Sequence, residues 1–469
     1  MDLLNRDALA LSGMIERREV SAAEVMQATL AQIAAWNGAV NAIVSIPDED
    51  ALMAMAHEAD ATPRKGWMHG LPLAVKDLAN AQGLETSFGS PIFAGQVAAG
   101  DDLFVARMRA AGALIIGKTN VPEFGLGSHT YNPVHGPTLN PYDTGRSAGG
   151  SSGGAAVALA TRMLPVADGS DMMGSLRNPA GWCNVYGFRP SWGRVPSEPL
   201  GDMFLHTMST NGPMGRSPAD IAALLQVQQG WDVRQPFGLA SDAMAPLEVP
   251  VQGRRIAWLA DWDGAYAMEP GILELCEAAL QVFRDLGVHV DLVQAPFPAE
   301  KIWEAWQTLR WFSMAGKFAP LHAQPRTKAM LKPDAVWEIE SGLTLSAMQV
   351  HRASALRSEW FRTAADLFTR YDALALPTAQ VWPFPVEWTS PARIGARQMD
   401  TYHRWMEVVI PASLLGLPAL AIPAGFGVNG LPMGLQLIGA VRNDLGVLQL
   451  GQAYHAATDW PNKMPPRQP

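Results

Sequence analysis

Segments with helical periodicity alternate with short apolar runs along most of this chain. The helical segments predict two helices within residues 4–35 and further helices over 49–60, 102–111, 153–159 and 270–286. The apolar runs predict strands over 71–75, 113–116, 255–259, 288–293, 371–376 and 419–422. Because strands and helices alternate, we expect an α/β fold, with a single large domain whose mixed β-sheet core is covered by helices on both faces.

The second N-terminal helix has a clear start signal. Ser21, followed three residues later by Glu24, has the spacing of a capping box. Met26, Leu30 and Ile33 then recur at helical spacing and form an apolar face. This pattern predicts that the helix begins directly after Ser21.

The uncharged stretch between Glu407 and Arg442 is the best candidate for a membrane segment. Prolines interrupt it at positions 411, 418, 423 and 432, so short buried strands joined by turns fit better than a spanning helix. The N-terminus lacks the basic start and apolar core of a signal peptide. We therefore expect a cytoplasmic protein that does not associate with membranes.

Composition narrows the function classes. The chain has 469 residues, of which 48% are hydrophobic, so it can bury a large core and is not a disordered or fibrous protein. A net charge of −9 argues against a protein that neutralises nucleic-acid phosphates. Only two cysteines are present, too few for a disulfide framework. The 43 glycines and 36 prolines indicate many turns.

Two patterns that suggest other chemistry do not hold. Residues 112–119 match the phosphate-binding Walker A pattern, but that site needs a helix opening at its lysine. Here the intervening residues are strand-like, and Pro122 follows Lys118 too closely for a helix, so a helix–strand junction fits better. The ten histidines show no metal-binding spacing, so we expect no metal and no cofactor.

Three segments carry residues suited to nucleophilic catalysis. Lys76 ends an apolar strand, Ser151 and Ser152 lie in the glycine-rich run 146–156, and Ser175 follows Gly174. A lysine acts as a base only when burial or a nearby cation lowers its pKa, and a serine needs such a base to attack. Glycines around the serines permit the close backbone approach that an oxyanion pocket requires.

In this order and spacing the three segments resemble the amidase signature family. The resemblance covers most of the chain and includes the motifs at residues 40–44, 117–124, 140–143, 186–190, 193–196 and 430–439. It implies one amidase domain over 1–469. Residues 66–220 would be the signature core, 221–359 a variable cap-like region and 360–469 the C-terminal part of the core.

The resemblance also implies a Ser–Ser–Lys triad. Ser175 matches the nucleophile that forms an acyl-enzyme with the amide carbonyl. Ser151 matches the bridging serine, held on a cis peptide bond, which relays the proton to Lys76. Backbone N–H groups of the oxyanion loop match Met172, Met173, Gly174 and Ser175. Ser152 matches a supporting serine, and Asp171 and Arg177 are expected to form an internal ion pair that braces the loop.

Met173 departs from the family pattern, which commonly has two glycines before the nucleophile. A side chain at this position requires a negative φ or a strained backbone. We therefore expect an altered oxyanion loop and a substrate range that relatives do not predict.

The substrate we predict is a small aromatic or apolar carboxamide or anilide. Trp303, Trp306 and Trp311 lie in one helical stretch and either line an acyl pocket or belong to the core. Phe124 and Gly125 match a loop that borders the substrate in the family. We therefore assign Phe124, Gly125, Trp303 and Trp311 to substrate binding as a prediction.

Two alternatives remain open. The chain could be the amidase-like component of a tRNA-dependent amidotransferase, which works with partner subunits and ATP. It could also be a catalytically inactive binding protein on an amidase fold, although Lys76, Ser151 and Ser175 are all present. The expected partner is a small-molecule amide, with no nucleic acid and no membrane, and the sequence leaves a homodimer open.

Overall fold

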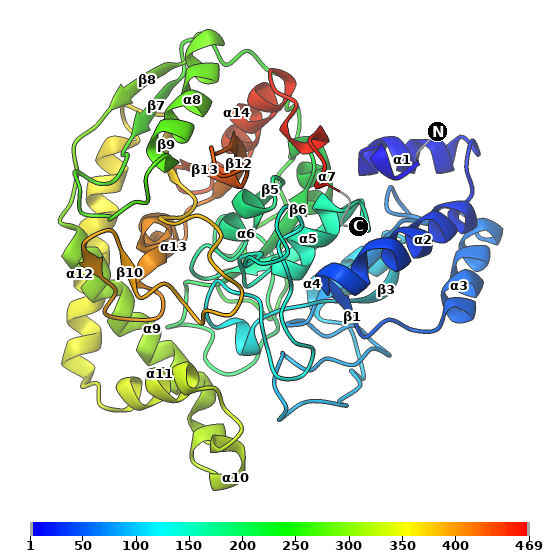
Figure 1. Cartoon of the computed structure of the whole chain (residues 1–469), viewed down its shortest axis with the longest axis horizontal. Helices are drawn as coiled ribbons and strands as arrows, with labels where there is room; N and C mark the ends of the chain where they lie inside the picture. The colour runs from blue at the N-terminus through cyan, green and yellow to red at the C-terminus, as the bar shows by residue number, and fades with distance from the viewer. Residues whose placement is uncertain (1–2, 467–469) are drawn as a thin grey trace.

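An eight-stranded mixed sheet forms the centre of the computed structural model, which describes residues 3–466 (Figure 1). Its strand order is β4-β6-β5-β12-β13-β9-β7-β8, and all neighbours are antiparallel except β9-β7 and β7-β8. The strands are β4 (Val166–Asp171), β5 (Tyr186–Arg189), β6 (Thr210–Gly215), β7 (Arg255–Trp258), β8 (His289–Leu292), β9 (Ala373–Pro377), β12 (Ala419–Phe426) and β13 (Pro432–Gly439).

Helices cover both faces of this sheet. On β12, Leu420 packs against Gly451 of α14, whereas the next residue, Ala421, joins an apolar cluster with residues of α5 and α6. Successive side chains of a strand point to opposite faces, so these helices lie on opposite sides. The helices are α1 (Ala8–Glu16), α2 (Ala22–Val40), α3 (Glu49–Ala61), α4 (Leu103–Ala110), α5 (Gly153–Ala160), α6 (Arg177–Trp182), α7 (Pro218–Gln228), α8 (Ile272–Asp285), α9 (Ala299–His322), α10 (Pro325–Lys328), α11 (Pro333–Leu343), α12 (Ala347–Leu367), α13 (Ile410–Leu415) and α14 (Asp444–Ala456).

A smaller three-stranded sheet carries the lysine. Its order is β1-β3-β2, with β1 (Ile43–Val44), β2 (Pro72–Lys76) and β3 (Leu114–Thr119), and β2 runs parallel to β3. The backbone N–H of Lys76 donates to the carboxylate of Asp168 on β4, at 3.1 and 3.2 Å to its two oxygens. This contact joins the end of β2 to the edge strand of the main sheet.

Most of the sequence-based elements are confirmed. Ser21 and Glu24 form the predicted capping box, and the β7–α8–β8 unit is parallel as expected. Lys118 lies inside β3, where its ammonium pairs with Asp77 at 3.4 Å, so no helix opens there and the Walker A match has no structural counterpart. The uncharged stretch folds into α13, β12 and β13. Within residues 3–466, no helix is long and apolar enough to cross a membrane.

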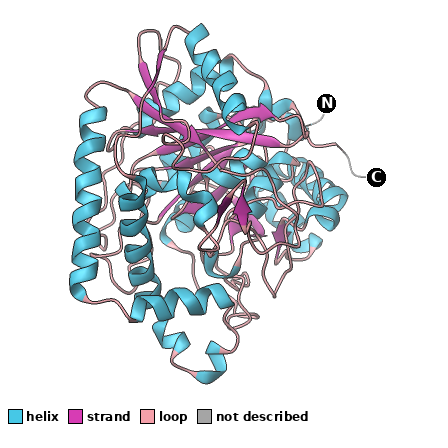
Figure 2. Ribbon diagram, turned by 60° about the vertical axis from the view of Figure 1, so that its left-hand side comes forward, coloured by secondary structure: helices cyan, strands magenta, loops and turns pink. Residues whose placement is uncertain are grey.

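The long helices α9, α11 and α12 stand beside the sheet as a separate group (Figure 2). Trp303 and Trp306 of α9 are buried in the main core, which is the second of the two places predicted for them. Trp311 is half-buried and packs edge-on against Trp337 of α11, with ring centroids 5.5 Å apart.

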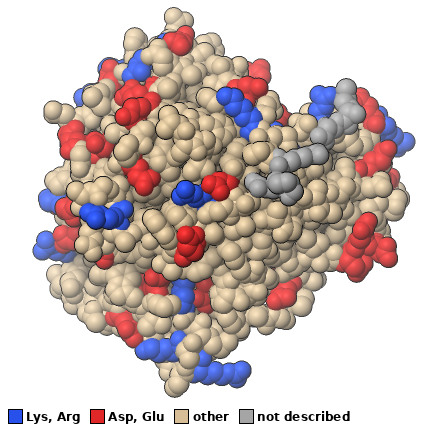
Figure 3. All heavy atoms as spheres, in the orientation of Figure 1, with Lys and Arg blue, Asp and Glu red and all other residues tan. Residues whose placement is uncertain are grey.

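The molecular surface carries both signs of charge. On the face in Figure 3, acidic and basic side chains are interspersed, and no continuous basic patch lies on that face. Together with the net charge of −9, this distribution offers no track for a phosphate backbone on that side of the molecule.

Candidate active site

Lys76 lies at the end of β2 with only 1% of its surface exposed. Its Nζ is 2.8 Å from the Oγ atoms of both Ser151 and Ser152. It also lies 3.0 Å from Ser170 Oγ and 3.3 Å from the Ser170 carbonyl on β4. Three serine hydroxyls therefore surround one buried amine.

Burial changes the proton affinity of this amine. Loss of solvent lowers the pKa of Lys76 from 10.5 to about 7, although the carboxylates of Asp168 and Asp171 oppose the change. Burial likewise raises the pKa of Asp168 to about 6, against the Lys76 N–H and the nearby ammonium groups. The neutral form of Lys76, which can accept a proton, is therefore accessible near neutral pH.

The glycine-rich run delivers Ser151 and Ser152 to the start of α5. The Gly150–Ser151 peptide bond is cis, as the family resemblance implied. The loop is closely packed, because a Cβ on Gly154 would lie 2.3 Å from the backbone nitrogen of Asn120. The N–H of Ser152 donates to the carbonyl of Ser175 at 3.3 Å, so the two serine loops are in direct contact.

Ser175 lies in the turn between β4 and α6 and is 7% exposed. Gly174 before it has φ +78, in the left-handed region, and a Cβ there would lie 2.8 Å from Val409. Met173 is not among the residues with positive φ, and its side chain is buried in the main core. The turn therefore accommodates the unusual methionine without a left-handed backbone at position 173.

The four expected oxyanion amides do not have equal roles. The N–H of Gly174 donates to Asp171 Oδ1 at 2.9 Å and is already engaged. For the N–H groups of Met172, Met173 and Ser175, no acceptor is found within the described part of the chain. Gly174 therefore differs from the other three residues, whose N–H groups make no hydrogen bond within residues 3–466.

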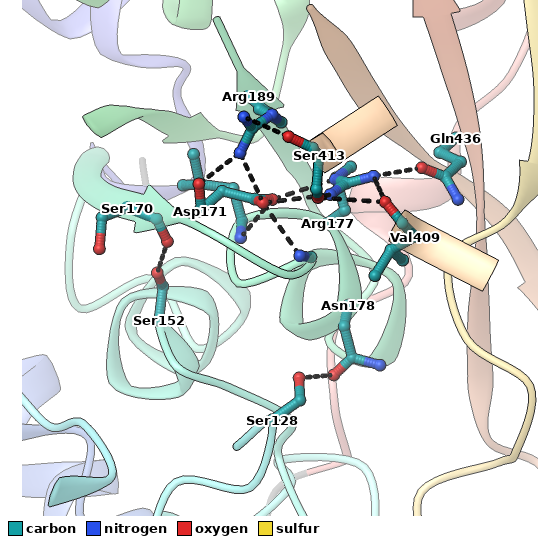
Figure 4. A network of polar contacts seen from close by, with 12 residues as sticks. Ser128, Ser152, Ser170, Asp171, Arg177, Asn178, Arg189, Val409, Ser413 and Gln436 are labelled. Carbon is teal, nitrogen blue, oxygen red and sulfur yellow. Dashed lines mark hydrogen bonds and ion pairs between the residues drawn. The ribbon is translucent and has the colours of Figure 1, made fainter. Parts of the chain in front are cut away.

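Asp171 braces this turn at the centre of a buried network (Figure 4). Arg177 donates to it from Nε at 3.0 Å and from Nη2 at 3.1 Å, which confirms the expected ion pair. Arg189 of β5 adds a second guanidinium, with Nη1 3.2 Å from Oδ1. Arg177 in turn donates to Gln436 Oε1, to Ser413 Oγ and to the carbonyl of Val409.

The site contains a serine hydroxyl, a buried amine of lowered pKa and backbone N–H groups without a partner in the described residues, a combination that suits acyl transfer. The family comparison agrees with it, since residues 24–448 match the family model described as Amidase. This chain belongs to the amidase family. Acylamidases are among its relatives, so this amidase is an enzyme that hydrolyses amide bonds.

Its relatives include both acylamidases and tRNA-dependent amidotransferase subunits. The acylamidase of Rhodococcus erythropolis is 31% identical over 477 residues, covering 98% of this chain and 96% of that protein. The A component of the glutamyl-tRNA(Gln) amidotransferase of Methylococcus capsulatus is 33% identical over 496 residues, covering 98% and 99%. Among solved structures, a bacterial aryl acylamidase of the amidase signature enzymes superposes with a TM-score of 0.90 at 28% identity, covering 97% of each chain.

The residues predicted to bind substrate occupy two different places in the amidase. Gly125 borders Ser151, because a Cβ there would lie 3.3 Å from Ser151 Oγ. Phe124 packs with Phe318 of α9, with ring centroids 4.7 Å apart. By contrast, the Trp303 ring packs at a tilt against His403 and carries the Arg404 guanidinium 4.3 Å above it. Contacts of Trp303 and Trp311 with substrate stay a prediction.

Several residues of the site were not singled out from the sequence. Ser170 and Asp168 lie on β4, just before the turn that carries Ser175. That their side chains face Lys76 could be inferred only once the position of Lys76 was known. Arg189 lies within a motif used for the family resemblance, but nothing in the sequence linked it to Asp171. Gln436 and Ser413 come from more than 200 residues further along the chain and carry no local signal.

The Asp171 network gives a stability prediction. Burial raises the cost of its charge, but Arg177 and Arg189 outweigh that cost and hold the pKa of Asp171 well below its usual range. Asp171→Asn leaves two buried guanidiniums without their anion, so we expect the free energy of unfolding to fall by about 3–5 kcal/mol. Urea unfolding at pH 7 measures the change.

The matched control is Asp291→Asn. Asp291 also pairs with an arginine, Arg255, but both side chains are roughly half exposed, so its loss should cost at most about 1 kcal/mol. Equal losses in the two variants would show that Asp171 is no more important to the fold than a surface carboxylate.

Proposed function

We propose that this amidase cleaves small aromatic or apolar amides through an acyl-enzyme on Ser175, with Ser151 relaying the proton to Lys76. The observation that carries this proposal is the buried Lys76 amine, 2.8 Å from Ser151 Oγ and with a pKa of about 7. Such an amine can take a proton from a serine at neutral pH, whereas an ordinary lysine cannot.

The hydrogen-bond inventory supports Lys76 as the base. A neutral amine has two hydrogens and one lone pair, so it can donate twice and accept once. Ser152 and Ser170 offer acceptors at 2.8 and 3.0 Å for the two hydrogens. The lone pair then remains for the hydroxyl hydrogen of Ser151. When Ser175 attacks, its proton passes to Ser151 and the Ser151 proton passes to Lys76.

The same protons then complete the reaction. Lys76 returns a proton through Ser151 to the leaving nitrogen, and the C–N bond of the tetrahedral intermediate breaks. Water deprotonated by the same pair attacks the acyl-enzyme, and the acid is released. The free N–H groups of Met172, Met173 and Ser175 are the donors that we assign to the oxyanion.

An apolar wall beside the triad supports the substrate class. Phe124 and Met172 both pack against the cluster formed by α9 and α11, which includes Phe318. Phe93 adds a further ring, 6.2 Å from Phe124 between centroids. The nearby Arg310 guanidinium is paired with Glu338 at 2.6 Å, so it is not a free charge for a carboxylate substrate. An aryl or alkyl group fits this wall better than a charged one.

A substrate panel tests the function. The purified chain should hydrolyse p-nitroacetanilide, and kcat/KM for aryl amides should exceed that for malonamide by at least about 10-fold, because the apolar wall gains contact area with the ring. Release of p-nitroaniline or ammonia provides the readout. A preference for malonamide would overturn the substrate class while leaving amide hydrolysis in place.

The amidotransferase alternative rests on the likeness to the protein of Methylococcus capsulatus. That role requires partner subunits, so the chain alone would act poorly on simple anilides. Turnover of p-nitroacetanilide by the purified chain without ATP or partners therefore favours the acylamidase role. No turnover of any amide in the panel would overturn the acylamidase role and leave two candidates, the amidotransferase component and the catalytically inactive binding protein.

A further inference from the structure

Ser128 contacts both serine loops, and Figure 4 shows its contact with Asn178. Its Oγ lies 2.5 Å from the carbonyl oxygen of Gly150, which belongs to the peptide group that carries Ser151. The same Oγ lies 2.7 Å from the side-chain amide of Asn178, three residues after Ser175. All of these groups are buried. One hydroxyl therefore touches both the bridging-serine loop and the turn after the nucleophile.

The number of available hydrogen atoms determines which groups donate and which accept in this contact. A serine hydroxyl has one hydrogen, so Ser128 cannot donate both to Gly150 and to the Asn178 oxygen. As placed, Asn178 Nδ2 is buried and has no partner among the described residues. Turning the amide by 180° resolves both problems, because its oxygen and nitrogen are assigned from their partners. Asn178 Nδ2–H then donates to Ser128, and Ser128 donates to the Gly150 carbonyl.

We propose that Asn178 and Ser128 form a hydrogen-bonded bridge that positions Ser151 against Ser175. Both are positioning residues, and the inference rests on the proposed triad mechanism. Proton transfer between two hydroxyls tolerates little displacement, and an error of about 1 Å can cost about 100-fold in rate. The bridge ties the peptide of one serine to the segment that follows the other.

The packing around Asn178 leaves space for this bridge. A Cβ on Gly149 would lie 2.7 Å from the Asn178 amide, so the glycine at 149 is what lets the amide approach. Thr130 holds the neighbouring Gly149 carbonyl independently, at 2.8 Å from its Oγ1. Because of that second attachment, the loop should remain folded when the bridge is removed.

The experiment is a double-mutant cycle on Ser128 and Asn178. With p-nitroacetanilide, Asn178→Ala and Ser128→Ala should each lower kcat by about 10- to 100-fold with KM within about 2-fold. The double variant should lose no more than the larger single loss, because each change breaks the same chain. Ser128→Thr keeps the hydroxyl and should restore kcat to within about 3-fold of the wild type.

Asn178→Asp tests the direction of the bridge. An ionised aspartate cannot donate, so it should impair kcat as much as alanine does, although its shape matches asparagine. Asn184→Ala is the matched control: it removes a buried asparagine that donates to the Trp460 carbonyl beyond the far end of α6. Its kcat should stay within about 2-fold of the wild type.

The proposed function and the bridge can be separated. If the wild type hydrolyses no amide, the function fails, and the bridge is then measured by the rate at which a fluorophosphonate probe phosphonylates Ser175. Losses of kcat that multiply in the double variant, or full activity in Asn178→Asp, would overturn the bridge. Variants that lose thermal stability but keep wild-type kcat would likewise overturn it.

Discussion

Ser175→Ala should abolish amide turnover while leaving the fold intact. We expect kcat for p-nitroacetanilide to fall by about 10⁴- to 10⁶-fold, the range seen when a hydrolase loses its nucleophile. The turn holds Ser175 through its backbone, because the Ser175 carbonyl accepts a hydrogen bond from the Ser152 N–H. The hydroxyl is only a small part of the residue. Removing one oxygen from a 7% exposed side chain should change the melting temperature little.

Ser191→Ala is the matched control for that variant. Ser191 is also buried, at 3% exposure, and within the described residues its Oγ has no hydrogen-bond partner. Its removal should leave both kcat and stability near the wild-type values. The comparison must use enzyme purified with no contaminating host amidase, and circular dichroism should show the same fold in all three proteins. Turnover above one-tenth of wild type in Ser175→Ala would remove Ser175 from the nucleophile's role.

The elements that could be predicted from the sequence are those with a strong local pattern. The helix that starts after Ser21 has its own capping box, and the predicted strand 371–376 contains the continuous apolar run ALAL at 373–376. Strand β4, with the sequence VADGSD, was not predicted because five of its six residues are small or polar. It is a strand because it pairs with β6, and its glycine lets Leu176 approach, since a Cβ on Gly169 would lie 2.5 Å from that side chain.

The candidate site also has residues that could be predicted from the sequence and residues that could not. The residues of the proposed triad could be singled out because three linear motifs carry them in a recognisable order. The groups that support the triad come from distant parts of the chain, as Arg189 and Gln436 do around Asp171 and Arg177. One sequence contains no record of which distant residues meet. The engagement of the Gly174 N–H by Asp171 also depends on the turn's backbone, which the residue types alone do not determine.

Lys76→Met should reduce kcat/KM by several orders of magnitude, about 10³-fold or more, because no other side chain can accept the Ser151 proton at 2.8 Å. Methionine matches the length and apolar character of the lysine stem, so the packing at the end of β2 should persist. Progress curves with p-nitroacetanilide at pH 8 measure the loss. Activity within tenfold of wild type would require another base.

The pH dependence of kcat/KM tests whether the loss of activity in Lys76→Met reflects the loss of a base. In the wild type, log kcat/KM should be flat above pH 7 and fall with a slope of one below it, because the pKa of Lys76 is about 7 and its protonated form is inactive. The residual rate of Lys76→Met should lack this limb. A limb that survives the substitution would belong to a different group.

The pH dependence of stability also reports on the Lys76 amine, and this measurement needs no substrate. The pKa of Lys76 is about 7 in the folded protein and 10.5 in the unfolded chain, so the unfolded state binds more protons between these values. The contribution of Lys76 to the free energy of unfolding therefore rises with pH from about pH 7 to 10.5 and is constant below pH 7. Urea unfolding at several pH values should show this rise in the wild type. Lys76→Met should lack it, because methionine has no proton to bind. An equal rise in both proteins would mean that Lys76 is not the buried neutral amine on which the proposed chemistry depends.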